Sequence, residues 1–132
     1  MTIAVDTSAI ISVLLGEDDA ESMVGALADA AGDIAISAAT LVETKIVAQV
    51  KQGAAATADL RTLLTTVDAD VIAVDADQAE IAAAAWMRFG RGRHPAALNF
   101  GDCFSYALAK SLGVPLLFKG NDFTQTDIDS AL

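Results

Sequence analysis

Apolar residues along this chain fall into short continuous runs and longer periodic segments. Four short runs are predicted strands, at residues 3–5, 34–36, 71–74 and 114–118. Continuous apolar runs of this length are typical of strands that are buried on both faces of a parallel sheet. Polar residues follow directly after each run and mark where the strand ends.

Between these runs, apolar residues recur at the spacing of amphipathic helices. The predicted helices cover residues 9–15, about 17–31, about 38–52, 54–66, about 76–89 and 100–112. Thr7 or Ser8, Ser37 and Asn99 precede three of them and are predicted N-caps. Strands that alternate with helices predict a mostly parallel sheet with helices on both faces. The predicted fold class is therefore α/β, a single three-layer α/β/α sandwich spanning residues 1–132.

Composition narrows the class of protein. Hydrophobic residues make up 54% of the chain and aromatic residues 5%, which predicts a folded core of small, closely packed side chains. No apolar run approaches the roughly 18 residues that a membrane helix needs, and we expect a cytoplasmic location. Cys103 and His94 are the only residues of their types, which excludes a disulfide framework and a cysteine-rich zinc site. We expect Cys103 to be buried and His94 to be an exposed loop residue.

The net charge of −10 argues against broad contact with nucleic-acid phosphates. Two features weaken that argument. Bound divalent cations would offset the negative charge locally, and Arg88, Arg91 and Arg93 lie together in one short stretch. An acidic surface is equally suited to a basic partner.

Four carboxylates lie near predicted strand ends or helix starts: Asp6, Glu43, Asp102 and Asp122. The carboxyl ends of parallel strands share one edge of a sheet, where ligands usually bind. We therefore expect these four side chains to meet there. Carboxylates gathered without basic neighbours are typical of a Mg²⁺ or Mn²⁺ site, which can cleave phosphodiesters with activated water.

Each acid also has a purely structural interpretation. Asp6 can be a helix cap, and Glu43 can be a solvated helix residue. Asp102 can complete a capping box that begins at Asn99, which does not exclude metal binding. Asp122 can form an Asx-turn.

Four segments in chain order resemble the PIN domain, and more narrowly the VapC toxins of bacterial VapBC toxin–antitoxin systems. They are IAVDTSAI (residues 3–10), TLVE (40–43), LNFGDCFSYALA (98–109) and PLLFKGNDF (115–123). The resemblance implies an α/β/α sandwich and a Mg²⁺- or Mn²⁺-dependent endoribonuclease, a hydrolase. The third segment is the most specific of the four.

The resemblance also assigns roles to individual residues. Asp6 and Asp102 match the metal-binding aspartates, and Glu43 matches the acid that positions metal or water. Thr7, Ser8 and Asn99 match polar neighbours that hold these carboxylates. The fourth acid departs from the commonest pattern, because Phe118-Lys119-Gly120 replaces the usual Thr-x-Asp and the next acid is Asp122. A second metal is therefore not implied.

Substrate and partners follow from the same resemblance. The implied substrate is RNA in single-stranded or loop form, cleaved to a 5′-phosphate and a 3′-hydroxyl. Arg88, Arg91, Arg93 and Lys119 are candidate RNA contacts. A VapB-like antitoxin is expected to place an Arg or Lys near the metal site, and the chain is expected to form a homodimer.

Two other functions stay open on sequence grounds. A PIN-fold module that binds RNA without turnover is compatible with the altered fourth acid. Alternatively, Asp6 is a phosphoacceptor served by Lys119, as in receiver or phosphatase folds, although no second acid lies close to Asp6 in the sequence.

Overall fold

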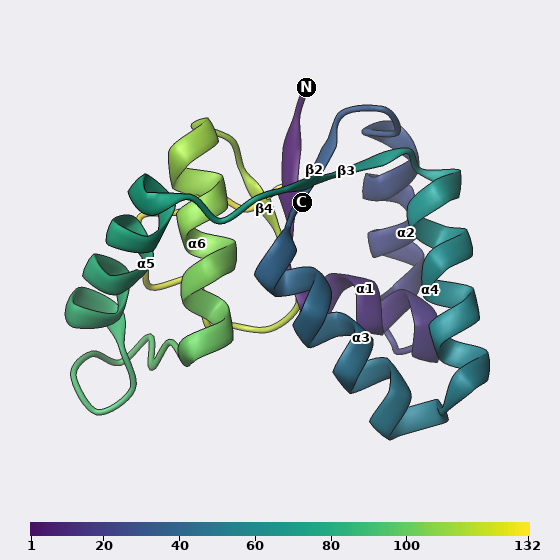
Figure 1. Cartoon of the computed structure of the whole chain (residues 1–132), viewed down its shortest axis with the longest axis horizontal. Helices are drawn as coiled ribbons and strands as arrows, with labels where there is room; N and C mark the ends of the chain where they lie inside the picture. Colours follow the sequence, from purple (N-terminus) through teal and green to yellow (C-terminus); the bar gives the residue numbers. More distant parts are fainter.

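Four short parallel strands form the centre of the molecule (Figure 1). The computed structural model describes all of residues 1–132. The strands are β1 (Ile3–Val5), β2 (Ile34–Ser37), β3 (Ala69–Ile72) and β4 (Leu116–Leu117), in the order β3-β2-β1-β4. Every neighbouring pair is parallel. The carboxyl ends of the strands therefore share one edge, as the sequence predicts.

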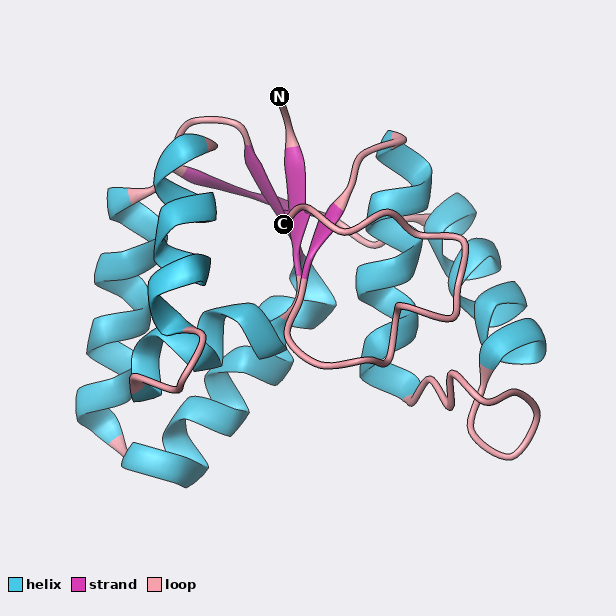
Figure 2. Cartoon of the chain, turned by 180° about the vertical axis from the view of Figure 1, so that it is seen from behind, coloured by secondary structure: helices cyan, strands magenta, loops and turns pink.

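Six helices cover the two faces of the sheet. They are α1 (Thr7–Leu15), α2 (Ala20–Asp29), α3 (Ala38–Gln52), α4 (Ala54–Thr66), α5 (Ala76–Phe89) and α6 (Phe100–Leu112). Helices α5 and α6 lie together on one side of the strands, and α1, α2 and α4 lie on the other (Figures 1 and 2). The predicted three-layer α/β/α architecture is confirmed. No helix is both long and apolar enough to span a membrane.

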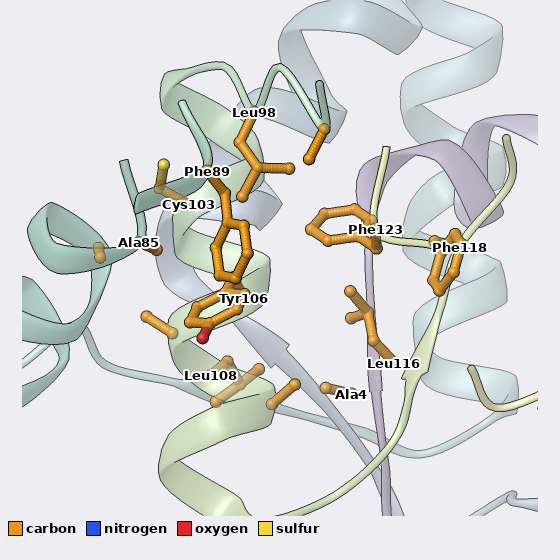
Figure 3. Packing of buried hydrophobic residues seen from close by; sticks show 14 of the residues in the cluster. Ala4, Ala85, Phe89, Leu98, Cys103, Tyr106, Leu108, Leu116, Phe118 and Phe123 are labelled. Carbon is orange, nitrogen blue, oxygen red and sulfur yellow. The ribbon is translucent and has the colours of Figure 1, made fainter. Parts of the chain in front are cut away.

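Alternation along β1 divides the core in two. Ala4 faces α5 and α6 in a cluster that includes Leu98, Leu108 and Phe123 (Figure 3). Ile3 and Val5 point the other way, into a cluster with residues of α1, α2 and α4. Successive side chains of a strand point to opposite faces, so this three-residue strand contributes to both cores. Because β1 is a central strand of the sheet, Asp6, the next residue, lies at the middle of the sheet's carboxyl edge.

Three strand predictions differ from the structure in their bounds, β2 only by its extension to Ser37. Strand β3 covers Ala69–Ile72 instead of residues 71–74, because its ladder aligns Ala69 with Ile34 and Ile72 with Ser37. It is an edge strand whose middle residues are exposed, so it can contain Asp70. Strand β4 has only two residues, since the short β1 pairs with Leu116 and Leu117 alone.

The chain's single cysteine and single histidine are both partly or fully enclosed. Cys103 is buried as predicted, and burial raises the pKa of its thiol to about 11. The expectation of an exposed, unpartnered His94 is wrong. Its Nδ1 accepts the backbone N–H of Ala96 at 3.0 Å, and its ring lies edge-on to Phe89. These contacts close the loop that leads into α6.

Candidate active site

Asp6 stands where β1 ends and α1 begins. Its Oδ2 accepts the backbone N–H of Ser8 at 3.1 Å and the Ser8 hydroxyl at 2.6 Å, and its Oδ1 accepts the Ser105 hydroxyl at 2.5 Å. Asp6 itself is thus the N-cap of α1, and the prediction of Thr7 or Ser8 in that role is wrong. The carboxylate is 4% exposed. Three hydrogen bonds fix its orientation at the sheet edge.

Asp102 lies in the first turn of α6 and completes the predicted capping box. Its Oδ2 accepts the Asn99 backbone N–H at 3.0 Å, and its own N–H donates to Asn99 Oδ1 at 2.8 Å. The pKa of the Asp102 carboxyl is raised to about 7, mainly by burial and also by the negative charges of Asp6, Asp122 and Glu43, while the hydrogen bond from the Asn99 backbone lowers it. The other three predicted acids therefore all act electrostatically on Asp102.

Glu43 projects from α3 towards the start of α6. Its Oε1 accepts the Thr7 hydroxyl at 2.6 Å, so the residue next to Asp6 in sequence holds the second acid. Glu43 and Asn99 line a groove of about 440 Å³ between α3 and α6. The remaining walls of the groove are mostly apolar, which places the acid at the edge of a hydrophobic surface.

Lys119 is paired with two acids outside the candidate site. Its Nζ forms ion pairs with Glu17 at 3.1 Å and Asp19 at 3.5 Å, while its backbone N–H donates to Ser8 Oγ at 3.0 Å. The first of these contacts raises the pKa of the ammonium group. A phosphoacceptor mechanism at Asp6 would need this lysine beside the carboxylate, so the geometry does not favour that interpretation.

The basic stretch lies on the outer surface of α5 and the following loop. Arg88 pairs with Asp127 at 3.7 Å and lies over the Phe89 ring. Arg93 stacks over Trp86, and Arg91 is exposed. None of the chain's ion pairs includes any of the four site acids. The structure therefore brings the acids together but leaves the arginines apart from them.

The donor set fits a hard divalent cation. Three donors do not converge tightly enough to form a ready-made cage. Mg²⁺ does not need one, because one or two carboxylates with water and substrate phosphate complete its shell. Asp6 and Asp102 are buried carboxylates without a cationic partner, and a divalent ion would relieve the mutual repulsion seen at Asp102.

Comparison with known proteins agrees with this geometry. Residues 3–129 match the family profile described as PIN domain. The chain belongs to the PIN-domain family. It is 48% identical to a ribonuclease VapC of Mycolicibacterium smegmatis over 124 residues, covering 94% of this chain and 95% of the relative. It is 46% identical to ribonuclease VapC30 of Mycobacterium tuberculosis, covering 94% of each chain.

Solved structures share the fold of this PIN domain at lower identity. Mycobacterium tuberculosis VapC20, described as a sarcin-ricin loop cleaving toxin, superposes with a TM-score of 0.78 at 21% identity over 96% of both chains. A chain of a toxin–antitoxin complex from Klebsiella pneumoniae gives a TM-score of 0.72 at 20% identity, covering 99% of this chain and 98% of that one. At these identities, the likeness concerns the fold alone.

Two residues of this PIN-domain site escaped the sequence predictions. Ser105 donates to Asp6, and it lies one helical turn after Asp102, a spacing that places both on one face of α6. Gly101 lies against the Glu43 carboxylate so closely that a Cβ at this position would collide with it. A glycine in the first turn of a helix, where alanine is favoured, is the signal that could have indicated this close approach.

Replacing Gly101 with alanine is expected to lower RNA cleavage by about 10- to 100-fold, because a misplacement of about 1 Å can have that effect. The colliding atoms belong to the end of the flexible Glu43 side chain, so the carboxylate should turn away while the helix stays intact. Gly25→Ala in α2, where nothing lies near the added Cβ, is the matched control. Equal cleavage rates for both variants would contradict this account.

Proposed function

We propose that this VapC-type ribonuclease hydrolyses RNA phosphodiester bonds with Mg²⁺ or Mn²⁺ held by Asp6 and Asp102. The observation that carries the proposal is the raised pKa of Asp102, which burial raises most and which the charges of Asp6, Asp122 and Glu43 raise as well. Four interacting carboxylates at the strand ends, without a cationic side chain among them, form a cation site rather than a structural ion-pair network.

The divalent cation, when bound, supplies the positive charge that activates water and stabilises the charge developing on the phosphate. The protein's own groups supply orientation. Ser8 and Ser105 hold both oxygens of Asp6, and the Asn99 backbone holds one oxygen of Asp102. Glu43, fixed by Thr7, orients the attacking water and accepts its proton. In-line attack would form the new bond between phosphorus and the water oxygen and break the P–O3′ bond, and the departing 3′-oxygen would take a proton from solvent, which gives a 5′-phosphate and a 3′-hydroxyl.

RNA is the proposed substrate, in single-stranded or loop form, since splayed bases can enter a cleft beside the acids. The groove between α3 and α6 begins at Glu43 and is lined by Phe100 and Phe104, on which bases can stack. Among the candidate basic residues, Arg91, in the loop before α6, is exposed and forms no ion pair or cation–π contact, which leaves it available for the RNA backbone. Asp122 is a proposed fourth acid that modulates the charge of the site.

The proposed partners are a VapB-like antitoxin and a second copy of the chain. Two solved complexes with this fold are toxin–antitoxin assemblies bound to DNA, VapBC2 of Rickettsia felis and VapBC of Salmonella typhimurium. An acidic cleft suits an inhibitory Arg or Lys. Exposed Val42, Ile46 and Phe100 are among the apolar residues that line the groove, and an exposed apolar surface of this kind suits self-association.

Metal removal tests the proposed function. Purified protein is incubated with structured RNA after treatment with EDTA, and then with Mg²⁺ or Mn²⁺ restored. We expect cleavage only with restored metal, and 5′-phosphate ends on the products. Asp6→Asn, purified in parallel, controls for contaminating nucleases. Cleavage that persists in EDTA would contradict the proposal, and RNA binding without cleavage under all conditions would favour the binding-module alternative.

A further inference from the structure

Buried hydroxyl groups extend inward from Asp6. Ser105 donates to Asp6 Oδ1 and is within 3.2 Å of the Thr40 hydroxyl. Because the single proton of Ser105 is engaged by the carboxylate, Thr40 must supply the proton between the two hydroxyls. Ser105 is 0% exposed and Thr40 is 1% exposed. This arm therefore runs from β1 through α6 to α3 without contact with solvent.

A second arm leads from Glu43 back to the same threonine. Thr7 donates to Glu43 Oε1, and its oxygen is 3.0 Å from the Thr44 hydroxyl. Because the proton of Thr7 is engaged by Glu43, Thr44 has to supply the proton between the two threonines, and its one proton is within reach of both Thr7 Oγ1 and the backbone carbonyl of Thr40 at 2.8 Å. Thr44 is fully buried. Thr40 thus lies where the two arms meet, with its hydroxyl on the Asp6 side and its carbonyl within reach of Thr44 on the Glu43 side.

Packing alone does not account for these hydroxyls. A buried hydroxyl loses hydration and needs a partner, whereas valine fills the space of threonine without that requirement. Here every hydroxyl of the two arms has a partner, and both arms end on a carboxylate oxygen. Such satisfied buried networks fix the geometry of the groups they hold.

We propose that Ser105, Thr40 and Thr44 are positioning residues that hold the Asp6 and Glu43 carboxylates in a fixed mutual orientation. The inference rests on the proposed function, in which Asp6 binds the metal and Glu43 orients water. It assigns different consequences to the two arms. Ser105 acts on a metal ligand, Thr44 acts on the water-orienting acid, and Thr40 acts on both.

Isosteric variants separate the arms. Ser105→Ala is expected to weaken Mn²⁺ binding, measured by calorimetry and by electron paramagnetic resonance, about three- to tenfold and to lower kcat about tenfold. Thr44→Val is expected to lower kcat by a similar factor with unchanged Mn²⁺ affinity, and Thr44→Ser to restore it. Thr40→Val is expected to impair both properties. KM for RNA should stay unchanged throughout.

Thr62→Val is the matched control. Thr62 also donates to the carbonyl four residues before it, but on the exposed surface of α4. Its cleavage and Mn²⁺ binding should equal those of the wild type. If Ser105→Ala unfolds, Ser105→Cys keeps the volume with a weaker donor. Melting temperatures, measured for every variant, identify effects that arise from stability alone.

The outcomes distinguish this inference from the proposed function. If the wild type cleaves RNA and both Ser105→Ala and Thr44→Val cleave it at the same rate, the positioning roles are overturned and the nuclease assignment stands. If the wild type binds Mn²⁺ but does not cleave RNA, the proposed function is refuted. The role of Ser105 in holding Asp6 would then stand if Ser105→Ala binds Mn²⁺ more weakly than the wild type, and fall if the affinities are equal. Equal loss of Mn²⁺ binding in Thr44→Val and Ser105→Ala would contradict the separation of the arms.

Discussion

Asp102→Asn is expected to make the metal-free protein more stable at pH 8 while it lowers RNA cleavage by about 100- to 1000-fold. The carboxyl titrates near 3.8 in the unfolded chain and near 7 in the folded protein. Between these values the unfolded state loses its proton first, so ionisation favours unfolding and stability falls as pH rises. Above pH 7 the full cost is present, about 2 kcal/mol after allowance for solvent screening.

Asparagine removes that cost and keeps the local structure. Its side-chain oxygen can still accept the Asn99 backbone N–H, so the capping box survives on that side. The lost negative charge, however, removes a proposed metal ligand. The gain in stability and the loss of activity have the same origin. The carboxylates that would hold a cation repel one another when no cation is bound.

Urea unfolding of both proteins in EDTA checks this prediction. At pH below 3.8 the residue is uncharged in either state, so the two unfolding free energies should agree, and the variant's advantage should grow between pH 4 and 7. Acids remote from the site titrate alike in both proteins and cancel in the difference, whereas Asp6, Asp122 and Glu43 are relieved of the Asp102 charge in the variant, which adds to its advantage. Saturating Mg²⁺ should reverse the order by stabilising the wild type. A variant less stable than the wild type at pH 8 without metal would contradict the raised pKa.

The acids of the site could be predicted from sequence because each is tied to a local signal. Asp6 follows a buried strand, Asp102 stands three residues after an N-cap, and the parallel topology brings both to one edge. The bounds of α3 to α6 agree with the prediction for the same reason, since caps and glycines mark them, whereas α1 begins at Thr7 instead of residue 9 and α2 covers Ala20–Asp29 instead of about 17–31. Strand β3 was misplaced because its register depends on pairing with β2, which no local pattern specifies.

Contacts between distant residues were beyond sequence reasoning. Ser105 and Asp6 are 99 positions apart, and Lys119 and Glu17 are 102 apart. Residue type alone is compatible with many hydrogen-bond partners for Ser105 and for Lys119. Lys119 was a candidate phosphate contact for this reason, whereas the folded chain engages it with Glu17 and Asp19. Local patterns thus predict where the acids lie along the chain, and the tertiary structure shows which side chains hold them.

Phe123→Ala is expected to destabilise the protein by about 3–5 kcal/mol, the usual cost of deleting a large buried aromatic side chain. Phe123 is the largest of the fully buried side chains, at 1% exposure. It packs against Phe118 with ring centroids 5.1 Å apart, in the core next to Leu116 (Figure 3). Phe123 lies in the turn region after β4. Few backbone hydrogen bonds hold this region, so its structure depends on the packing of the Phe123 ring.

The same side chain anchors the position of Asp122, which precedes it and is itself exposed. Phe123→Leu retains much of the buried surface and should cost less stability, while Asp122→Asn, which removes one of the charges that act on Asp102, should not lower the unfolding free energy. Chemical denaturation measures all three. If Phe123→Leu lowers cleavage as much as Asp122→Asn while staying folded, the aromatic anchor sets the place of the fourth acid. A Phe123→Ala protein as stable as the wild type would show that this turn does not depend on its buried ring.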